Sequence, residues 1–232
     1  MKRHLLAAAA AAALASGHGQ AATITGLFNT GTDPSNIALV GGNGLTDPHY
    51  VIQSSSSPGF AGQHAVTFFE PFAYVPNDAN SRWISISATG NPGHNTTVYR
   101  TTFNLSGLDP SSAQITGLWA SDNNSAILLN GVATGHVLPA SGVSFNFLHS
   151  FTISSGFVAG VNTLDFQVTD VGPPTALRVD SIGGSADLAP PTGPAIPEPG
   201  TWALLIIGLG LSGALARRSR AAATTVSKGR PS

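Results

Sequence analysis

The segment Leu164-Asp165-Phe166-Gln167-Val168-Thr169 decides the fold class, because its apolar and polar residues alternate strictly. Successive side chains of a β-strand point to opposite faces, so one face of this segment would be buried. On both sides of it, short β-rich stretches alternate with clusters of Gly, Asn, Asp, Ser and Pro. No stretch between 23 and 188 has a sustained helical period. The pattern predicts an all-β fold, an antiparallel β-sandwich over residues 22–188, with very little helix.

Several further segments of the body have the composition of strands and are separated by turn signals. The predicted strands are 23–28, 49–53, 65–69, 82–88, 98–105, 114–120, 126–129, 144–153, 162–169 and 176–182. Asp122-Asn123-Asn124-Ser125 joins two apolar runs. Asn130-Gly131 predicts a two-residue hairpin, because both residue types tolerate a positive φ.

The charge of the body argues against nucleic acid as a partner. Between residues 22 and 196, three arginines stand against ten Asp and Glu, which gives a net charge of −7. Binding to phosphates needs clustered Lys and Arg, and this segment has no such cluster. The chain also contains no cysteine, which excludes disulfides and thiolate metal sites.

The N-terminus has the order of a secretory signal peptide. Met1-Lys2-Arg3 is followed by an Ala-rich apolar run over 5–15 and by the small residues Gly19 and Ala21. We therefore expect a signal peptide over 1–21, cleaved by signal peptidase after Ala21 or Ala22. The alternative is an N-terminal amphipathic helix of a cytosolic protein, for which the run is short and rich in alanine.

The C-terminus combines a proline-rich segment, an apolar run and a basic stop. Residues 189–199 predict an extended linker. The run 202–216 has fifteen residues, so a helix of about 22 Å would face a bilayer core of about 30 Å. We expect one short transmembrane helix with its basic stop over 200–220 and a disordered cytoplasmic tail over 221–232. A buried core helix is the alternative, but it leaves the adjoining arginines unexplained.

This C-terminal order resembles the PEP-CTERM sorting signal. The matching residues are Pro197, Glu198, Pro199, Trp202, Arg217, Arg218 and Arg220. The resemblance implies a bacterial exported protein whose C-terminal helix anchors it in the inner membrane, with the ectodomain outside the cytoplasm. It also implies exosortase as the partner that processes the chain, which would then reach the cell surface or the exterior. Such signals generally stop close to the arginines, whereas this chain continues for twelve residues. A permanent anchor without processing is the alternative.

The body resembles galactose-binding-like jelly-roll domains. The likeness rests on Trp119-Ala120-Ser121-Asp122-Asn123, on Leu128-Leu129-Asn130-Gly131, and on the stretch from Gly160 to Val168. It implies a β-sandwich whose relatives often bind sugars. A carbohydrate-binding module acting on extracellular polysaccharide is therefore a second hypothesis for function.

Two groups of residues are candidates for ligand binding. Asp122, Asn123 and Asn124 could offer oxygen ligands to Ca²⁺, with Asp33 or Asp47 from other loops, although a plain turn explains them as well. Aromatic side chains could stack on sugar rings or fill the core, and these are Tyr74, Trp83, Tyr99 and Trp119. No other cofactor is expected.

No catalytic residue is predicted. Glu70 is the single Glu of the body, the histidines are isolated, and the chain has neither a Gly-x-Ser-x-Gly nor a His-Glu-x-x-His motif. A secreted hydrolase therefore remains only a third hypothesis. The sequence favours a non-catalytic exported surface or extracellular-matrix protein, associated with exopolysaccharide or biofilm.

Overall fold

The computed structural model describes residues 20–190 and 204–209 of the chain. The chain divides after Ala189 into two units, which are described separately. The predicted tail and almost all of the predicted signal peptide lie outside the described residues, as do most of the predicted linker and helix.

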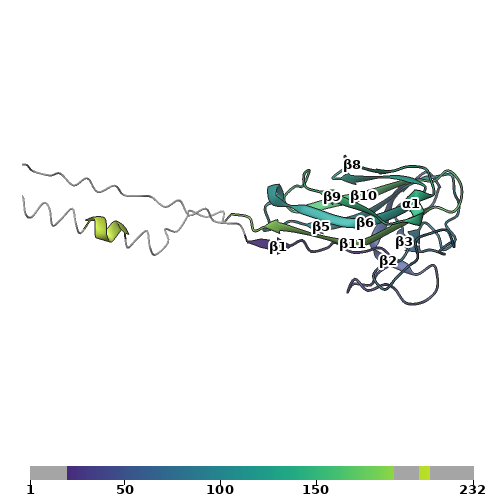
Figure 1. The fold of residues 1–232 in the computed structure, drawn as a ribbon, viewed down its shortest axis with the longest axis horizontal. Helices are drawn as coiled ribbons and strands as arrows, with labels where there is room; N and C mark the ends of the chain where they lie inside the picture. Colours follow the sequence, from purple (N-terminus) through teal and green to yellow (C-terminus); the bar gives the residue numbers. More distant parts are fainter. Residues whose placement is uncertain (1–19, 191–203, 210–232) are drawn as a thin grey trace, which may run out of the picture. The chain divides into compact units, whose positions relative to one another are not determined.

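Within residues 20–190, eleven antiparallel strands form the body (Figure 1). They are β1 (Ala21–Thr23), β2 (Thr46–Ser55), β3 (His64–Thr67), β4 (Ile84–Ser85), β5 (Thr96–Asn104), β6 (Gln114–Asp122), β7 (Asn124–Leu129), β8 (Val132–Leu138), β9 (His149–Ile153), β10 (Val161–Thr169) and β11 (Ala176–Asp187). A 3₁₀ turn, η1 (Pro110–Ser112), and one helical turn, α1 (Val143–Asn146), are the regular helices of this body. The all-β antiparallel prediction is confirmed.

The strands follow the order β8-β7-β10-β5-β2-β3-β4-β11-β6-β9, and β1 pairs with β11. The two halves of this path pack face to face, so that the sheet becomes a two-layered sandwich. Phe166 of β10 lies between the halves, with its ring 5.9 Å from that of Trp119 on β6 and 6.2 Å from that of Phe151 on β9. Burying these large rings removes much apolar surface from water, which stabilises the fold.

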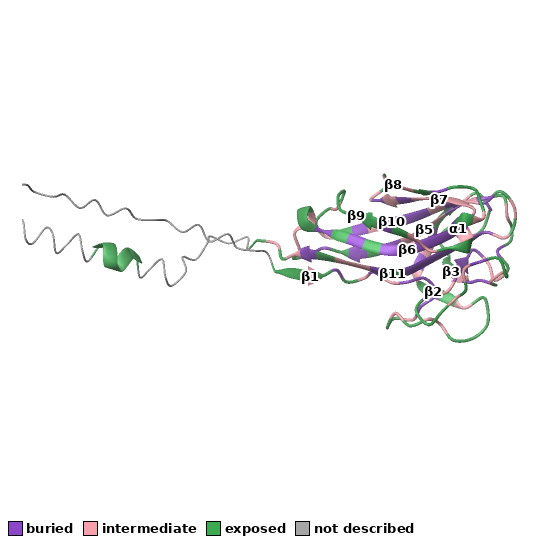
Figure 2. Ribbon diagram, viewed as in Figure 1, coloured by how far each residue is buried: buried purple, intermediate pink, exposed green. Residues whose placement is uncertain are grey.

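The alternating segment behaves as its sequence predicts. Leu164, Phe166 and Val168 are fully buried and point into the core, while Thr163 and Gln167 are half-exposed on the other face. Buried and more exposed residues are interspersed along the strands of the body (Figure 2). Asp165 is the exception, because it is buried although it belongs to the outer face. Its carboxylate pairs with the Arg100 guanidinium of β5, with both N–O distances at 2.7 Å.

Several predicted strands differ from those observed. The strand predicted over 144–153 is wrong in its first part, because residues up to Asn146 form α1 and only β9 follows. Phe145 explains the difference, since its ring stacks on Tyr74 at 4.9 Å and its carbonyl accepts a hydrogen bond from the Val75 N–H. The strand predicted over 23–28 is shorter, because pairing there is limited to the end of β1 and an isolated bridge at Thr25. Of the strand predicted over 82–88, the two residues of β4 pair.

The sequence did not predict β8, and two turns decide its place. Asn130 and Gly131 have φ values of 52° and 78°, so they form the predicted tight hairpin between β7 and β8. The second turn, around Asn123, is not a hairpin. It carries the chain from β6, which pairs with β11 and β9, to β7, which pairs with β10 and β8.

The body begins and ends at one end of the sandwich. Ala21 of β1 pairs with Asp187 of β11, and the Leu188 N–H donates to the Gln20 carbonyl at 3.1 Å (Figure 1). The opposite end holds the start of β11, where Ala176 pairs with Asp122, and the loop around Asp170.

In the second unit, residues 204–209 are helical and their side chains are exposed. Nowhere in the parts of the chain that the structure describes does a helix reach the length and apolar character needed to cross a membrane. The predicted transmembrane helix lies mostly outside the described residues.

Candidate functional site

The predicted calcium turn is a tightly bonded corner of the sandwich. The Tyr74 hydroxyl and the Asn123 side-chain amide both donate to the Asp122 carboxylate. The Asn123 side-chain oxygen in turn accepts the Val171 N–H at 2.8 Å. The Asp122 carboxylate and the Asn123 side-chain oxygen therefore accept hydrogen bonds within the fold, and Asn124 is half-buried at the start of β7.

Burial controls the charge of Asp122. Desolvation raises the pKa of its carboxyl to about 6, and the nearby Asp170 carboxylate acts in the same direction. The hydrogen bond from Tyr74 lowers the pKa and offsets part of this effect. The Asp170 carboxylate is itself held by the backbone N–H groups of His94 and Gly172, at 2.8 and 3.0 Å.

Asp33 and Asp47 hold other loops. The Asp47 carboxylate accepts the Gly31 N–H at 2.6 Å and the His49 N–H at 2.7 Å. Burial nevertheless raises the pKa of the Asp47 carboxyl. Asp33 accepts the N–H groups of Ser35 and Ile37. In residues 20–190 and 204–209, no three His, Asp or Glu side chains are grouped so as to hold a metal. Calcium binding stays a prediction.

The four aromatic side chains proposed as sugar platforms belong to the core. Trp83 and Tyr99 are fully buried, Trp119 is 1% exposed, and Tyr74 is 6% exposed. The indole N–H of Trp83 donates to the Val75 carbonyl at 2.8 Å, which satisfies its polar atom. Stacking on a sugar ring requires an accessible face, so the core reading is correct for all four.

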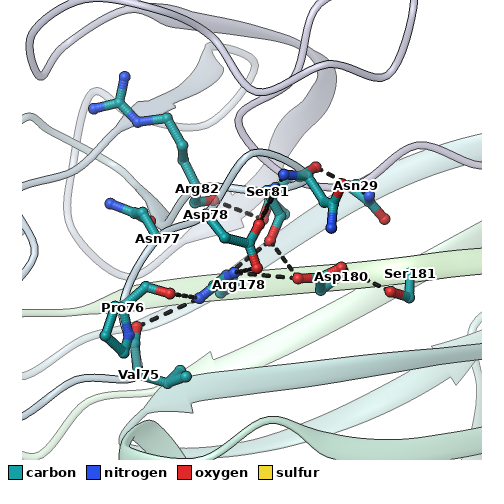
Figure 3. Close-up of polar contacts among 12 residues, drawn as sticks. Asn29, Val75, Pro76, Asn77, Asp78, Ser81, Arg82, Arg178, Asp180 and Ser181 are labelled. Carbon is teal, nitrogen blue, oxygen red and sulfur yellow. Dashed lines mark hydrogen bonds and ion pairs between the residues drawn. The ribbon is translucent and has the colours of Figure 1, made fainter.

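Arg178 is the centre of a buried polar cluster that the sequence reasoning did not single out (Figure 3). Its guanidinium donates to the Ser81 hydroxyl at 2.7 Å and to the Asp180 carboxylate at 3.1 Å. It also donates to the Pro76 carbonyl and lies 2.8 Å from the Asp78 carboxylate. Every partner except Asp180 comes from the loop before β4. The cluster therefore pins that loop to β11.

Asp78 completes this cluster at the surface. Its side chain is 46% exposed, and partial burial by itself favours the neutral form. The N–H groups of Asn80 and Ser81 and the charge of Arg178 outweigh that effect and lower the pKa of the carboxyl. The Asp78 carboxylate is therefore fixed as an anion by groups of its own loop and of β11.

Beside the cluster lies an open depression of about 480 Å³. It is lined by Ile37, Ala38, Leu39, Val40, Asn77, Asp78, Ala79 and Arg82. The Arg82 guanidinium bonds to the wall of the depression, since it donates to the carbonyls of Leu39 and Gly41 at 2.8 and 3.2 Å. Both charged groups of the depression thus serve the loops that form it.

Most histidines of the body bond to its backbone. Four of them bond a backbone carbonyl oxygen through a ring nitrogen: His49 that of Asp33, His64 that of Asp47, His136 that of Thr152, and His149 that of Val143. Glu70 accepts the Asn77 N–H at 2.5 Å. These contacts give each of the four histidines and Glu70 a partner in the backbone of the fold.

The sorting residues Pro197, Glu198, Pro199, Trp202, Arg217, Arg218 and Arg220 lie outside the described residues. Comparison with known families decides their nature. Residues 195–221 match the model of the PEP-CTERM protein-sorting motif. The chain carries a PEP-CTERM sorting motif. The motif covers the predicted linker end, helix and basic stop, and it leaves the body unassigned.

Among solved structures, similarity to the body is remote. The CBM36-1 domain of a multidomain xylanase from the hindgut metagenome of Trinervitermes trinervoides is 11% identical, with a TM-score of 0.30 over 53% of this chain and 90% of that chain. A family 35 carbohydrate binding module from an environmental isolate is 15% identical, with a TM-score of 0.31 over 61% of this chain and 98% of that one.

An exo-beta-1,3-galactanase from Phanerochaete chrysosporium is 14% identical, with a TM-score of 0.24 over 69% of this chain and 29% of that chain. No curated protein is significantly similar to the chain in sequence.

Proposed function

We propose that the chain is an exported, non-catalytic surface or matrix protein, which exosortase processes at its C-terminal motif and whose β-sandwich associates with neutral extracellular polysaccharide. The observation that carries the proposal is the sorting motif at 195–221. In the proposed route, a signal peptide starts export and the C-terminal helix holds the chain at the inner membrane. Processing then releases the sandwich to the cell surface or the exterior.

The charges of the body support a neutral partner. In the described residues of the body, each of the three arginines is engaged within the fold: Arg100 with Asp165, Arg178 with Asp180 and Asp78, and Arg82 with backbone carbonyls. The net charge of −7 between residues 22 and 196 would repel phosphate or carboxylate polymers. A neutral polysaccharide avoids this repulsion.

The segment Pro197-Glu198-Pro199 provides a direct test of sorting. Replacing Pro197, Glu198 and Pro199 by Ala removes the two prolines that would favour an extended backbone in a protease groove. In a host that has the exosortase, we expect this variant to keep its full mass and to stay in the inner membrane, as measured by intact mass and membrane fractionation.

A matched control removes two other prolines of the same linker. Pro190→Ala with Pro191→Ala lies outside the 195–221 motif and should be processed like the unchanged protein. Wild-type mass and location for the triple variant would refute sorting through this motif. A wild-type chain that itself keeps its full mass would favour the permanent anchor instead.

The polysaccharide part is tested separately, by co-sedimentation of the full chain with the neutral and anionic polysaccharides of the host. We expect retention on a neutral polymer only. Absence of binding across the panel would remove this part and leave the sorting proposal intact.

A further inference from the structure

A cavity of about 220 Å³ opens between β8 and β9, the two strands that end the sheet path. It is lined by Leu129, Val132, Ala133, Thr134, Thr152, Ile153, Ser154, Ser155 and Gly156. At roughly 30 Å³ per water molecule, this volume equals about seven waters, which gives room for one sugar ring.

A bulge in β8 forms one wall of the cavity. The register of β8 against β7 shifts between the pairs at Ala126 and Leu128, and Gly135 has a φ of 87° in this irregular stretch. The bulge directs the Thr134 hydroxyl to the Ile127 carbonyl at 2.8 Å. Such bulges re-aim side chains at a sheet edge.

His136 links β8 to β9 next to Thr152, one of the residues that line the cavity. Its Nε2 lies 2.9 Å from the Thr152 carbonyl oxygen, and its ring packs edge-on against Phe151 at 6.1 Å. This side-chain bond joins the two edge strands across the gap that no backbone ladder closes.

The side chains of Asn162 on β10 and of Asn130 in the β7–β8 hairpin hold the opposite wall, which is the loop over 154–160. Asn162 accepts the Val158 N–H at 2.9 Å and donates to the carbonyls of Val158 and Gly160. Asn130 donates to the Gly156 carbonyl at 3.0 Å and to the Asn162 side-chain oxygen at 2.8 Å. The loop is therefore fixed by a connected amide network, which makes the cavity a built feature of the fold.

The lining has no charged side chain and is rich in hydroxyl groups. Within the part of the chain that the structure describes, the hydroxyls of Thr152, Ser154 and Ser155 make no hydrogen bond to protein atoms. A hydroxyl can donate and accept, as the hydroxyls of a sugar do, and the exposed side chain of Val132 offers apolar surface to a ring face. A phosphate or carboxylate would find no cation here.

We propose that this cavity binds a single neutral sugar unit, such as a terminal residue of an extracellular polysaccharide. The proposal deepens the polysaccharide part of the function proposed above and is independent of sorting. The cavity lies at a sheet edge, so the rest of a polymer chain can extend into solvent.

The test uses the full chain in a detergent without a sugar headgroup, such as lauryldimethylamine oxide. Galactose, glucose, mannose and N-acetylglucosamine are titrated by ligand-observed NMR, with glucuronate as the charged probe. We expect at least one neutral sugar to bind with a Kd of about 1–10 mM, as is usual for a small ligand in a shallow site, and glucuronate to bind more weakly.

Matched variants on β9 locate the binding. Thr152 and Ser150 are both exposed and lie two positions apart on the same face, but only Thr152 lines the cavity. Thr152→Phe on β9 and Ala133→Phe on β8 should each weaken binding by about tenfold or more, because the larger side chain fills the site. Ser150→Phe should leave binding unchanged.

Each outcome decides the proposal. Loss with Thr152→Phe and Ala133→Phe but not with Ser150→Phe supports it. Absence of neutral-sugar binding, or binding that survives both cavity variants, overturns it. If a polymer still co-sediments in those variants, the polysaccharide role stands at another surface. Processing at 195–221 is measured by mass, so a failure of sorting is seen separately.

Discussion

The Arg178 cluster and the β8–β9 cavity are both polar, but their polar groups are used differently. Around Arg178 the guanidinium, two carboxylates and the Ser81 hydroxyl bond to one another under a loop. Around the cavity, the hydroxyls of Thr152 and Ser154 face solvent and a hollow. Groups satisfied inside the fold stabilise it, whereas exposed and unpaired hydroxyls remain available to a ligand. Polar groups bonded inside the fold therefore serve its stability, whereas polar groups left exposed at a hollow can serve binding.

The largest expected effect breaks the structural cluster. Arg178→Met should lower the free energy of unfolding by about 3–5 kcal/mol, because the buried Asp180 carboxylate loses its cation. Urea unfolding of the full chain, followed by circular dichroism, measures this loss. Adding Asp180→Asn to Arg178→Met should recover part of it, since no uncompensated carboxylate then remains buried and the unpaired Asp78 is 46% exposed.

Arg100→Met is the matched control for this prediction. The Arg100 side chain is 29% exposed while that of Arg178 is fully buried. Its removal should cost about 1–2 kcal/mol, because the Arg100 guanidinium holds Asp165, whereas that of Arg178 also holds Ser81, Pro76 and Asp78. Equal losses for the two arginine variants would contradict the distinction.

The second expected effect loosens the cavity wall. Asn162→Ala removes the bonds to Val158 and Gly160 and the partner of Asn130. We expect a loss of about 2–3 kcal/mol in the free energy of unfolding and weaker binding of the sugar found in the titration. Hydrogen exchange of the Val158 amide should rise in the same variant.

Asn104→Ala serves as the control, because Asn104 is exposed and its side chain bonds to Ser106 within the same turn. It should change stability by less than about 1 kcal/mol and leave sugar binding unchanged. Sugar affinity that is unaffected by Asn162→Ala would show that the amide network does not support the cavity.

The smallest expected effect concerns pH at the β6–β7 corner. Burial raises the pKa of Asp122 from 3.8 to about 6. The folded chain holds this proton more tightly than the unfolded chain. The protonated Asp122 carboxyl therefore adds to the free energy of unfolding, fully below about pH 4, and this contribution is lost as the pH rises through about 6. Asp122→Asn should therefore reduce the fall in stability between pH 4 and 7 by about 1–2 kcal/mol.

Tyr74→Phe sharpens the same test in the opposite direction. The Tyr74 hydroxyl lowers the pKa of Asp122, so its removal should shift the pH at which stability is lost to a higher value. Unfolding measured across the pH range in the three proteins distinguishes them. Identical pH profiles would contradict the assignment of this proton to Asp122.

The sequence by itself determined the all-β fold class, the β7–β8 hairpin and the sorting motif of the chain. The alternation around Phe166 and the Asn130-Gly131 pair are local signals, because strand pleating and positive φ depend on neighbouring residues alone. The sorting motif is likewise a contiguous order of residues, and the family comparison confirmed it at 195–221.

Only the tertiary structure decided how the polar and aromatic residues are used. From the sequence, Trp83 and Trp119 could be sugar platforms or core residues, and their burial in two separate hydrophobic clusters settled the choice. Arg178 pairs with Asp78, which lies one hundred residues earlier in the chain. The cavity is lined by residues of β8 and β9, and no sequence pattern indicates that these two strands lie next to each other. Such contacts depend on which strands pack together, and a local pattern does not carry that information.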